Sequence, residues 1–226
     1  MIKVFVKYLG YTRATNQYTM FNTTNTKFLF LLYVSVMLII TFLQQEFILL
    51  PELQAIDIVE EDTKVQLLEK WQKIRWLSYL SAPIILLLRL FLVTMCLYIG
   101  GFFDENMTIR KFKEWWNVAM ISQSIMILYS VTLLVMNICY GSETSLYVTE
   151  YTSLLFLGKD NMEQWLKLPL AAVNIFEIAY WCIMSLLIMR MTTNKFGSSF
   201  KYVMSTYGVG YLFYIIFMMF LILYLV

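Results

Sequence analysis

Five long apolar segments, separated by shorter polar ones, constrain this chain more than any other feature of its sequence. A helix needs about 20 mostly apolar residues to cross the roughly 30 Å hydrocarbon layer of a bilayer. The segments that meet or approach this length are residues 28–43, 77–99, 116–139, 168–189 and 202–226, and the first is the shortest. Of the 226 residues 60% are hydrophobic and 14% charged, whereas soluble domains carry roughly 25% charged residues. We therefore predict an all-α integral membrane protein, a bundle of about five transmembrane helices.

The positions of the basic residues set the predicted orientation of these helices. With five passes the two termini lie on opposite faces of the membrane, and the positive-inside rule chooses between the two arrangements. A cytoplasmic N-terminus places ten basic residues inside (Lys3, Lys7, Arg13, Lys27, Arg110, Lys111, Lys113, Arg190, Lys195 and Lys201) and six outside (Lys64, Lys70, Lys73, Arg75, Lys159 and Lys167). We predict that residues 1–27 form a short cytoplasmic tail and that residues 28–226 form the five-helix domain. Its C-terminus is then extracytoplasmic, with extracytoplasmic loops at about 44–76 and 140–167. Residues 1–9 fit a short helix on the membrane surface and a frayed end equally well.

Tryptophan side chains lie near the ends of the predicted spans. Rings of this kind sit at the level of the lipid headgroups and anchor a helix there. The predicted interface anchors are Trp71, Trp76, Trp115, Trp116 and Trp165. Trp181 lies in the middle of the fourth span, where we expect it to pack between helices.

The two predicted extracytoplasmic loops carry local signals of their own. Thr63 and Gln66 match a capping box, which predicts an amphipathic helix that continues into the second span or lies beside it. In the second loop the apolar stretch 154–157 needs cover, and both a membrane-dipping segment and a contact with another chain satisfy that need.

Two ionisable residues, Arg89 and Glu177, interrupt otherwise apolar spans. Each costs roughly 2.5–3.5 kcal/mol at the centre of a lone spanning helix, so each is expected to face protein or water. Counted from the outer ends of their spans, their depths are about 18 and 14 Å, which allows them to pair. Such a pair could fix how the second and fourth helices pack, with Asn174 and Ser81 as hydrogen-bonding neighbours. It could also serve as a proton or ion relay, or line a polar substrate pocket. The structural role is favoured because no span has the pattern of a helix broken at mid-membrane.

The sequence has little that supports catalysis. It contains no histidine, the commonest general base and metal ligand. Phosphate-binding glycine loops, nucleophile elbows, zinc motifs and nucleic-acid-binding signatures are also missing. The acidic run Glu60, Glu61 and Asp62 is expected to be solvated rather than to bind a metal. We predict no enzymatic activity, no cofactor, no metal site and no nucleic-acid partner.

The order of several short motifs in residues 75–226 resembles a known family. An arginine-bearing span leads into the loop GGFF (100–103) and TIRKF (108–112), and NIFE (174–177) lies in the fourth span, before a small basic loop and a last apolar span. This order resembles the five-helix Yip family of Ypt/Rab-interacting membrane proteins and its bacterial relatives. The resemblance implies a bacterial cytoplasmic (inner) membrane, with a eukaryotic endomembrane as the alternative. Eukaryotic members carry a long acidic N-terminal region for small GTPases, but residues 1–27 contain no Asp or Glu.

Three functions follow from these observations, in decreasing order of support. The first is a non-catalytic multi-pass membrane protein, a scaffold or subunit of a larger complex whose partners are the lipid bilayer and other membrane proteins. The second is a permease or transporter component that uses the Arg89/Glu177 pair. The third is an intramembrane enzyme acting on lipid, for which the sequence offers only scattered acidic residues.

Overall fold

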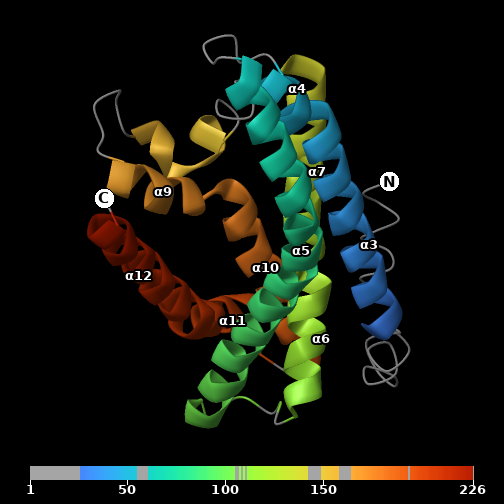
Figure 1. Cartoon of the computed structure of the whole chain (residues 1–226). Coiled ribbons are helices and arrows are strands. Elements are labelled where there is room, and N and C mark those ends of the chain that lie inside the picture. The colour runs from blue at the N-terminus through green and yellow to red at the C-terminus, as the bar shows by residue number, and fades with distance from the viewer. Residues whose placement is uncertain are drawn as a thin grey trace.

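The computed structural model of the chain describes residues 26–54, 61–104, 107, 109, 111–141, 149–157, 164–192 and 194–225. Within these ranges the regular structure is helical (Figure 1), and extended backbone pairs only at an isolated antiparallel bridge between Ser153 and Asn174. The prediction of an all-α protein is thus confirmed for the described part of the chain. The predicted cytoplasmic tail lies outside it except for Thr26 and Lys27, and so do the side chains of the acidic run at 60–62.

The first membrane-length helix is longer than predicted. Helix α3 (Thr26–Gln44) continues without a break into a π-helical turn, η1 (Gln45–Leu49), and then into α4 (Leu50–Gln54). Part of the predicted loop 44–76 is therefore a continuation of this helix.

Helix α5 (Glu61–Phe103) is a single element of 43 residues. At about 1.5 Å per residue it is roughly 65 Å long, about twice the thickness of the hydrocarbon layer. Its first turns are the amphipathic segment predicted from Thr63 and Gln66, so this helix does continue into the second span.

The third predicted span consists of two helices in sequence, α6 (Phe112–Ser122) and α7 (Ser124–Tyr140). They meet at Gln123, whose φ and ψ of −58° and −20° remain helical and whose amide donates to the carbonyl of Ala119. The junction is therefore a local tightening of one long helix and does not separate two spans.

The fourth predicted span is wrong as a continuous helix. It is divided into α9 (Gln164–Ala172) and α10 (Ile175–Met191), with Val173 and Asn174 between them. Pro169 lies inside α9. The expectation that no predicted span is broken is therefore wrong for residues 168–189.

The last predicted span is also irregular. Helix α11 (Phe196–Val203) leads into a π-helical turn, η3 (Met204–Gly208), and then into α12 (Val209–Leu225). Side-chain hydroxyls support the wide turn, because Thr206 Oγ1 and Ser205 Oγ both donate to the carbonyl of Tyr202, at 2.8 and 3.0 Å. Single π-helical turns of this kind are rare inside helices and concentrate at functional sites.

Within the described residues four helices are long and apolar enough to cross a membrane, namely Thr26–Leu49, Val65–Phe103, Phe112–Tyr140 and Phe196–Tyr224. Their outer faces carry large apolar side chains that no described part of the chain covers, such as Phe28, Ile85 and Phe217. A soluble protein does not present apolar surface on this scale. These helices have the length and the apolar surface of membrane spans.

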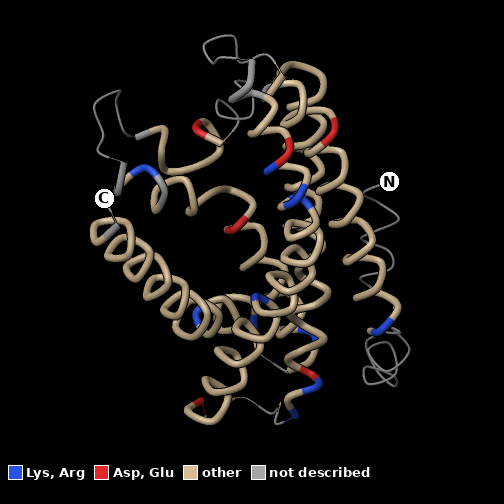
Figure 2. The backbone as a smooth tube through the Cα atoms, in the orientation of Figure 1, with Lys and Arg blue, Asp and Glu red and all other residues tan. Residues whose placement is uncertain are grey.

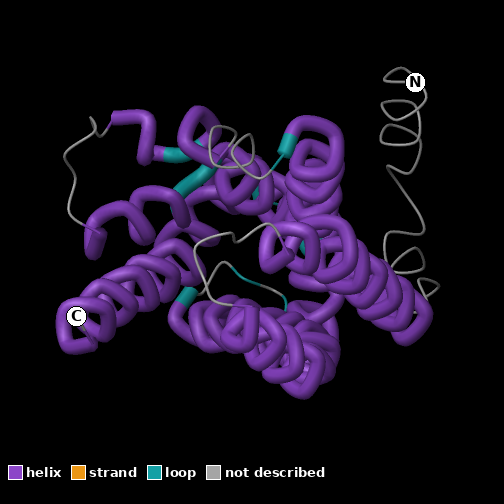
Figure 3. The backbone as a smooth tube through the Cα atoms, turned by 45° about the horizontal axis from the view of Figure 1, so that its top comes forward, coloured by secondary structure: helices purple, strands orange, loops and turns teal. Residues whose placement is uncertain are grey.

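The long helices alternate in direction (Figure 1). Helices α3 and α6–α7 run one way, α5 and α10 run the other way, and α12 turns back from the level of α11 toward the C-terminus. Charged residues concentrate toward the ends of the long helices, while α12 carries none (Figure 2). A second view shows α12 set apart from the α3, α5 and α7 group (Figure 3).

The core lies where α5, α6, α10 and α11 meet. Its fully enclosed side chains include Leu90, Leu97, Trp115, Tyr180, Met184 and Val203. By contrast, none of the described side chains of α12 is buried, and its main packing partners are α9 and η3. The core therefore fixes α10 and η3, the two elements that carry the polar site described next, while α12 extends from it as an apolar arm.

Candidate functional site

The structure brings together the two ionisable residues that interrupt the apolar spans. Arg89 of α5 donates from Nη2 to Oε2 of Glu177 in α10 at 2.9 Å. The two side chains differ in environment, since Glu177 keeps 2% of its side-chain surface exposed and Arg89 keeps 31%. The pair ties two elements that lie 88 residues apart in the sequence.

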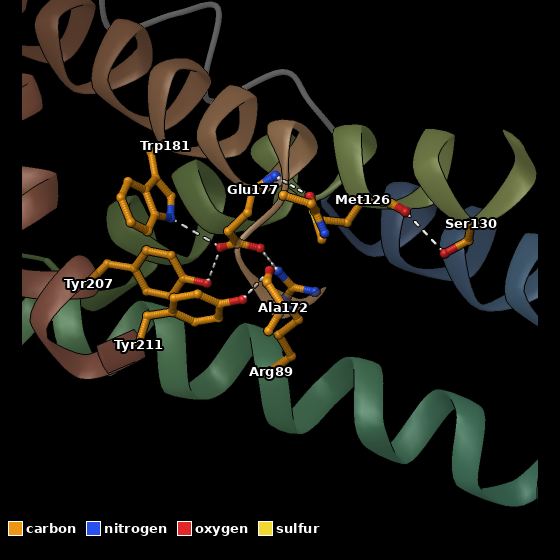
Figure 4. A network of polar contacts seen from close by, with 9 residues as sticks. Arg89, Met126, Ser130, Ala172, Glu177, Trp181, Tyr207 and Tyr211 are labelled. Carbon is orange, nitrogen blue, oxygen red and sulfur yellow. Dashed lines mark hydrogen bonds and ion pairs between the residues drawn. The ribbon is translucent and has the colours of Figure 1, made fainter. Parts of the chain in front are cut away.

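The carboxylate of Glu177 accepts two further hydrogen bonds, both on Oε1 (Figure 4). Tyr207 donates its hydroxyl at 2.7 Å, and Trp181 donates Nε1 at 3.1 Å. Tyr207 belongs to the π-helical turn η3, which places its hydroxyl toward α10. A buried carboxylate with three donors is stabilised as an anion, because each donor replaces a lost water contact.

Asn174 explains why α10 begins beside Glu177. Its backbone is extended, with φ and ψ of −120° and 169°, and its side-chain oxygen accepts from the amide of Glu177 at 2.9 Å. Asn174 is thus the N-cap of α10, and Glu177 sits in the first turn, where the helix dipole favours negative charge. The spacing Asn-x-x-Glu is a helix-start signal that the sequence analysis did not use.

The broken backbone between α9 and α10 finds partners in a separate segment. The amide of Leu154, at the start of the 3-10 turn η2 (Leu154–Leu157), donates to the carbonyl of Val173 at 3.0 Å. Ser153 forms its bridge with Asn174 at the same place, and Tyr211 donates its hydroxyl to the carbonyl of Ala172 at 2.7 Å. Non-helical backbone inside a bilayer would need partners from protein or water, and these contacts supply such partners.

Arg89 has a more open environment than its partner. The centre of its guanidinium lies 5.4 Å from the ring centroid of Tyr180, which is fully buried. The guanidinium has five N–H donors, and its hydrogen bond to the Glu177 carboxylate uses Nη2. Arg89 keeps 31% of its side-chain surface exposed, and the side of the guanidinium that faces away from Glu177 is called its open edge.

Only part of this site was predicted from the sequence. Asn174 does join the pair, but Ser81 does not, because its hydroxyl donates to the carbonyl of Ser78 at 3.0 Å. Tyr207 and Tyr211 were missed. The two tyrosines are four residues apart, which places them on one face of a helix, and this spacing could have predicted that they act together. Trp181 packs between helices as expected, edge-on to Tyr207 and Tyr211.

The predicted interface tryptophans fall in different environments. The prediction that Trp115 is an interface anchor is wrong, because this side chain is fully buried and stacks on Tyr202 with ring centroids 5.5 Å apart. Trp116 is partly buried and packs near Phe112. Trp76 is 60% exposed, Trp71 lies under the guanidinium of Arg75 at 5.4 Å, and the side chain of Trp165 lies outside the described residues.

Comparison of the chain with models of protein families, with curated proteins and with solved structures gives no match. The resemblance to the Yip family therefore stays a prediction. In the part of the chain that is described, no three His, Cys, Asp or Glu side chains gather as a metal site would require. The chemistry of the site has to be read from the Arg89–Glu177 network itself.

Tyr207→Phe is expected to lower the free energy of unfolding by about 1.5–3 kcal/mol, because it removes a 2.7 Å hydrogen bond to a buried charged acceptor. Thermal or SDS unfolding of the purified protein, followed by tryptophan fluorescence, measures this change. Tyr224→Phe is the matched control, since Tyr224 is 90% exposed and its substitution should change stability little. Equal stability of the two variants would contradict the network.

Asn174→Ala is expected to cost about 0.5–2 kcal/mol by removing the cap of α10. Asn174→Ser keeps a side-chain oxygen at the cap position and should retain most of the lost stability. The same unfolding assay compares the three proteins. If alanine and serine behave alike, the side chain of residue 174 does not cap α10.

Proposed function

We propose that this protein is a five-pass membrane protein with a cytoplasmic N-terminus, and that it acts as a non-catalytic scaffold or subunit of a larger membrane complex. The four membrane-length helices supply four passes. The fifth is assigned to α10 together with α9, because α10 alone, with 17 residues, is about 26 Å long. The excess of basic residues on the side of the N-terminus supports the orientation, and the likeness to the Yip family agrees with it.

The observation that carries this function is the contrast between the polar interior and the apolar exterior. The carboxylate of Glu177 accepts hydrogen bonds from Arg89, Trp181 and Tyr207, and this supports a structural role for the buried charge. On the outside, α12 presents Phe213, Phe217 and Phe220 on one face, each more than 60% exposed. Aromatic side chains at this spacing form a stripe suited to packing against a neighbouring helix.

Purification of the tagged full-length chain in mild detergent from its native membrane tests this function. We expect other membrane proteins to co-purify at a fixed ratio, in a particle whose protein mass exceeds the 26.8 kDa of one chain. The variant Phe213→Ala/Phe217→Ala/Phe220→Ala should weaken this assembly. A matched control changes Ile84, Leu88 and Phe91 of α5 to alanine, because these residues have the same spacing and are also exposed. A homogeneous monomer, or equal loss in both variants, would contradict the proposal.

The orientation has its own test. Fusion of alkaline phosphatase to the C-terminus should give an active enzyme in a bacterial host, and the same fusion at the N-terminus should be inactive. Activity at both ends, or at neither, would rule out five passes. The proposed location is the bacterial cytoplasmic membrane, with a eukaryotic endomembrane as the alternative. Recruitment of small GTPases is not part of the proposal, because residues 1–27 have no acidic residue.

A second candidate, a permease or transporter component, is favoured by one specific observation. The α9–α10 junction is a discontinuous helix in a membrane protein, and it lies against an ionisable pair. Discontinuous helices of this kind form the substrate and ion sites of many transporters. Uptake or efflux of a labelled solute by proteoliposomes, abolished in Glu177→Gln, would favour transport over the scaffold.

A further inference from the structure

The Arg89–Glu177 pair is unevenly neutralised. The charge of Glu177 is shared among the Tyr207 hydroxyl, the Trp181 indole and the first turn of α10, in addition to Arg89. Arg89 makes a single hydrogen bond to that carboxylate, and no other acid lies within ion-pair distance of it in the described chain. The guanidinium therefore keeps part of its positive potential, directed away from Glu177.

The open edge of Arg89 borders the apolar outer face of α5. Ile85 and Leu92 lie one turn before and one turn after it, and they are 63% and 52% exposed. The other side of Arg89 is lined by the buried core residues Leu86 and Val93. Arg89 thus sits on the boundary between the core of the protein and a face that contacts hydrocarbon.

Hydrocarbon cannot accept hydrogen bonds, so uncommitted N–H donors at this depth need another partner. The planar guanidinium presents its donors in a fork that matches carboxylate and phosphate oxygens. A ligand that joins such an anionic group to a long apolar chain would satisfy both the donors and the flanking apolar face.

We propose that the open edge of Arg89 binds the phosphate or carboxylate of an anionic amphiphile, whose hydrocarbon chain lies along the α5 face that carries Ile85 and Leu92. The site does not depend on the scaffold role. The Tyr180 ring, with its centroid 5.4 Å from the guanidinium carbon, and the bond to Glu177 hold the guanidinium in place for this ligand. Glu177 and Tyr180 are positioning residues, and Arg89 is the binding residue.

Native mass spectrometry of the full-length protein tests the site with phosphatidylglycerol as the probe and phosphatidylcholine of the same acyl chains as the reference. At high salt, which screens exposed charges, we expect one phosphatidylglycerol to be retained about tenfold more strongly than phosphatidylcholine. Arg89→Gln/Glu177→Gln keeps a neutral hydrogen-bonding pair and should fold, but should lose this preference. Lys201→Gln, which removes an exposed cation of α11, should keep it.

Three results would overturn the proposal. One is equal retention of the two lipids by the unaltered protein. Another is an unchanged preference in the double variant, which would place the site elsewhere. The third is displacement of the bound lipid by an equal concentration of inorganic phosphate, because an anion site without a chain-binding face would not discriminate between them.

Discussion

Arg89→Ala is expected to lower the free energy of unfolding by about 3–5 kcal/mol. The substitution removes the cationic partner of a carboxylate that is 2% exposed, and leaving one member of a buried pair uncompensated costs this amount. The cost falls on Glu177, because it is the more deeply buried member of the pair and its carboxylate loses a partner at 2.9 Å. SDS titration of the purified protein in mixed micelles, with tryptophan fluorescence as the signal, measures it.

A double-mutant cycle separates the pair from other effects of the substitution. Glu177→Gln keeps an oxygen for Tyr207 and Trp181 and removes the charge, so in the Arg89→Ala background it should restore part of the lost stability. We expect a coupling free energy of about 2 kcal/mol, within the range for residues in direct contact. Additive single and double variants, with no coupling, would refute the pair.

The second ion pair of the described chain is the matched control. Arg75 donates to Glu46 at 3.0 Å, the same geometry, but the two side chains are 37% and 27% exposed. Solvated pairs of this kind contribute about 0–1 kcal/mol. Arg75→Ala should therefore have a small effect, and a loss as large as that of Arg89→Ala would show that burial does not decide the difference.

The meeting of Arg89 and Glu177 could be predicted because helices have a fixed rise per residue. Both spans were counted from the same side of the membrane, and similar depths followed from their sequence positions alone. The donors Tyr207 and Trp181 could not be assigned in the same way. Tyr207 reaches Glu177 from a π-helical turn, which shifts the helical register and which no hydrophobic pattern indicates.

The break between α9 and α10 was missed for a physical reason. Hydropathy averages over a window, and residues 168–189 are apolar on both sides of Asn174. What starts α10 is a single hydrogen bond from the Glu177 amide to the Asn174 side chain, together with backbone partners from residues 153 and 154. The cap could have been read from the Asn-x-x-Glu spacing, but the long-range partners could not.

Trp115 illustrates a limit of placing residues by their distance from a span end. It was assigned to the membrane interface because it precedes the third span, but α5 continues to Phe103 and covers this level. Gly101 leaves room for the indole, since a Cβ built at that position would lie 3.3 Å from it. Because Gly101 has no side chain, α5 can cover Trp115, which is therefore a core residue and not the predicted surface anchor.

Gly100→Ala is expected to destabilise the protein by about 1–3 kcal/mol, because it overpacks the contact between α5 and the π-helical turn. A Cβ at Gly100 would lie 2.1 Å from Cγ2 of Thr206, far inside van der Waals contact. The methyl group cannot simply rotate away, since Thr206 Oγ1 is held by its 2.8 Å hydrogen bond to the Tyr202 carbonyl. The same SDS titration measures the loss.

The clash predicts its own suppressor. Thr206→Ser keeps the hydroxyl and its hydrogen bond but removes the methyl group, so Gly100→Ala/Thr206→Ser should recover most of the stability that Gly100→Ala loses. Gly197→Ala is the control, because a Cβ at Gly197 meets nothing within 4 Å. Alanine is the better helix former, so this control should be unchanged or slightly more stable. If Thr206→Ser does not restore the stability lost in Gly100→Ala, α5 and η3 do not approach each other at Gly100 as closely as the structure shows. Tyr207 would then lack the packing of η3 against α5 that holds its hydroxyl beside Glu177.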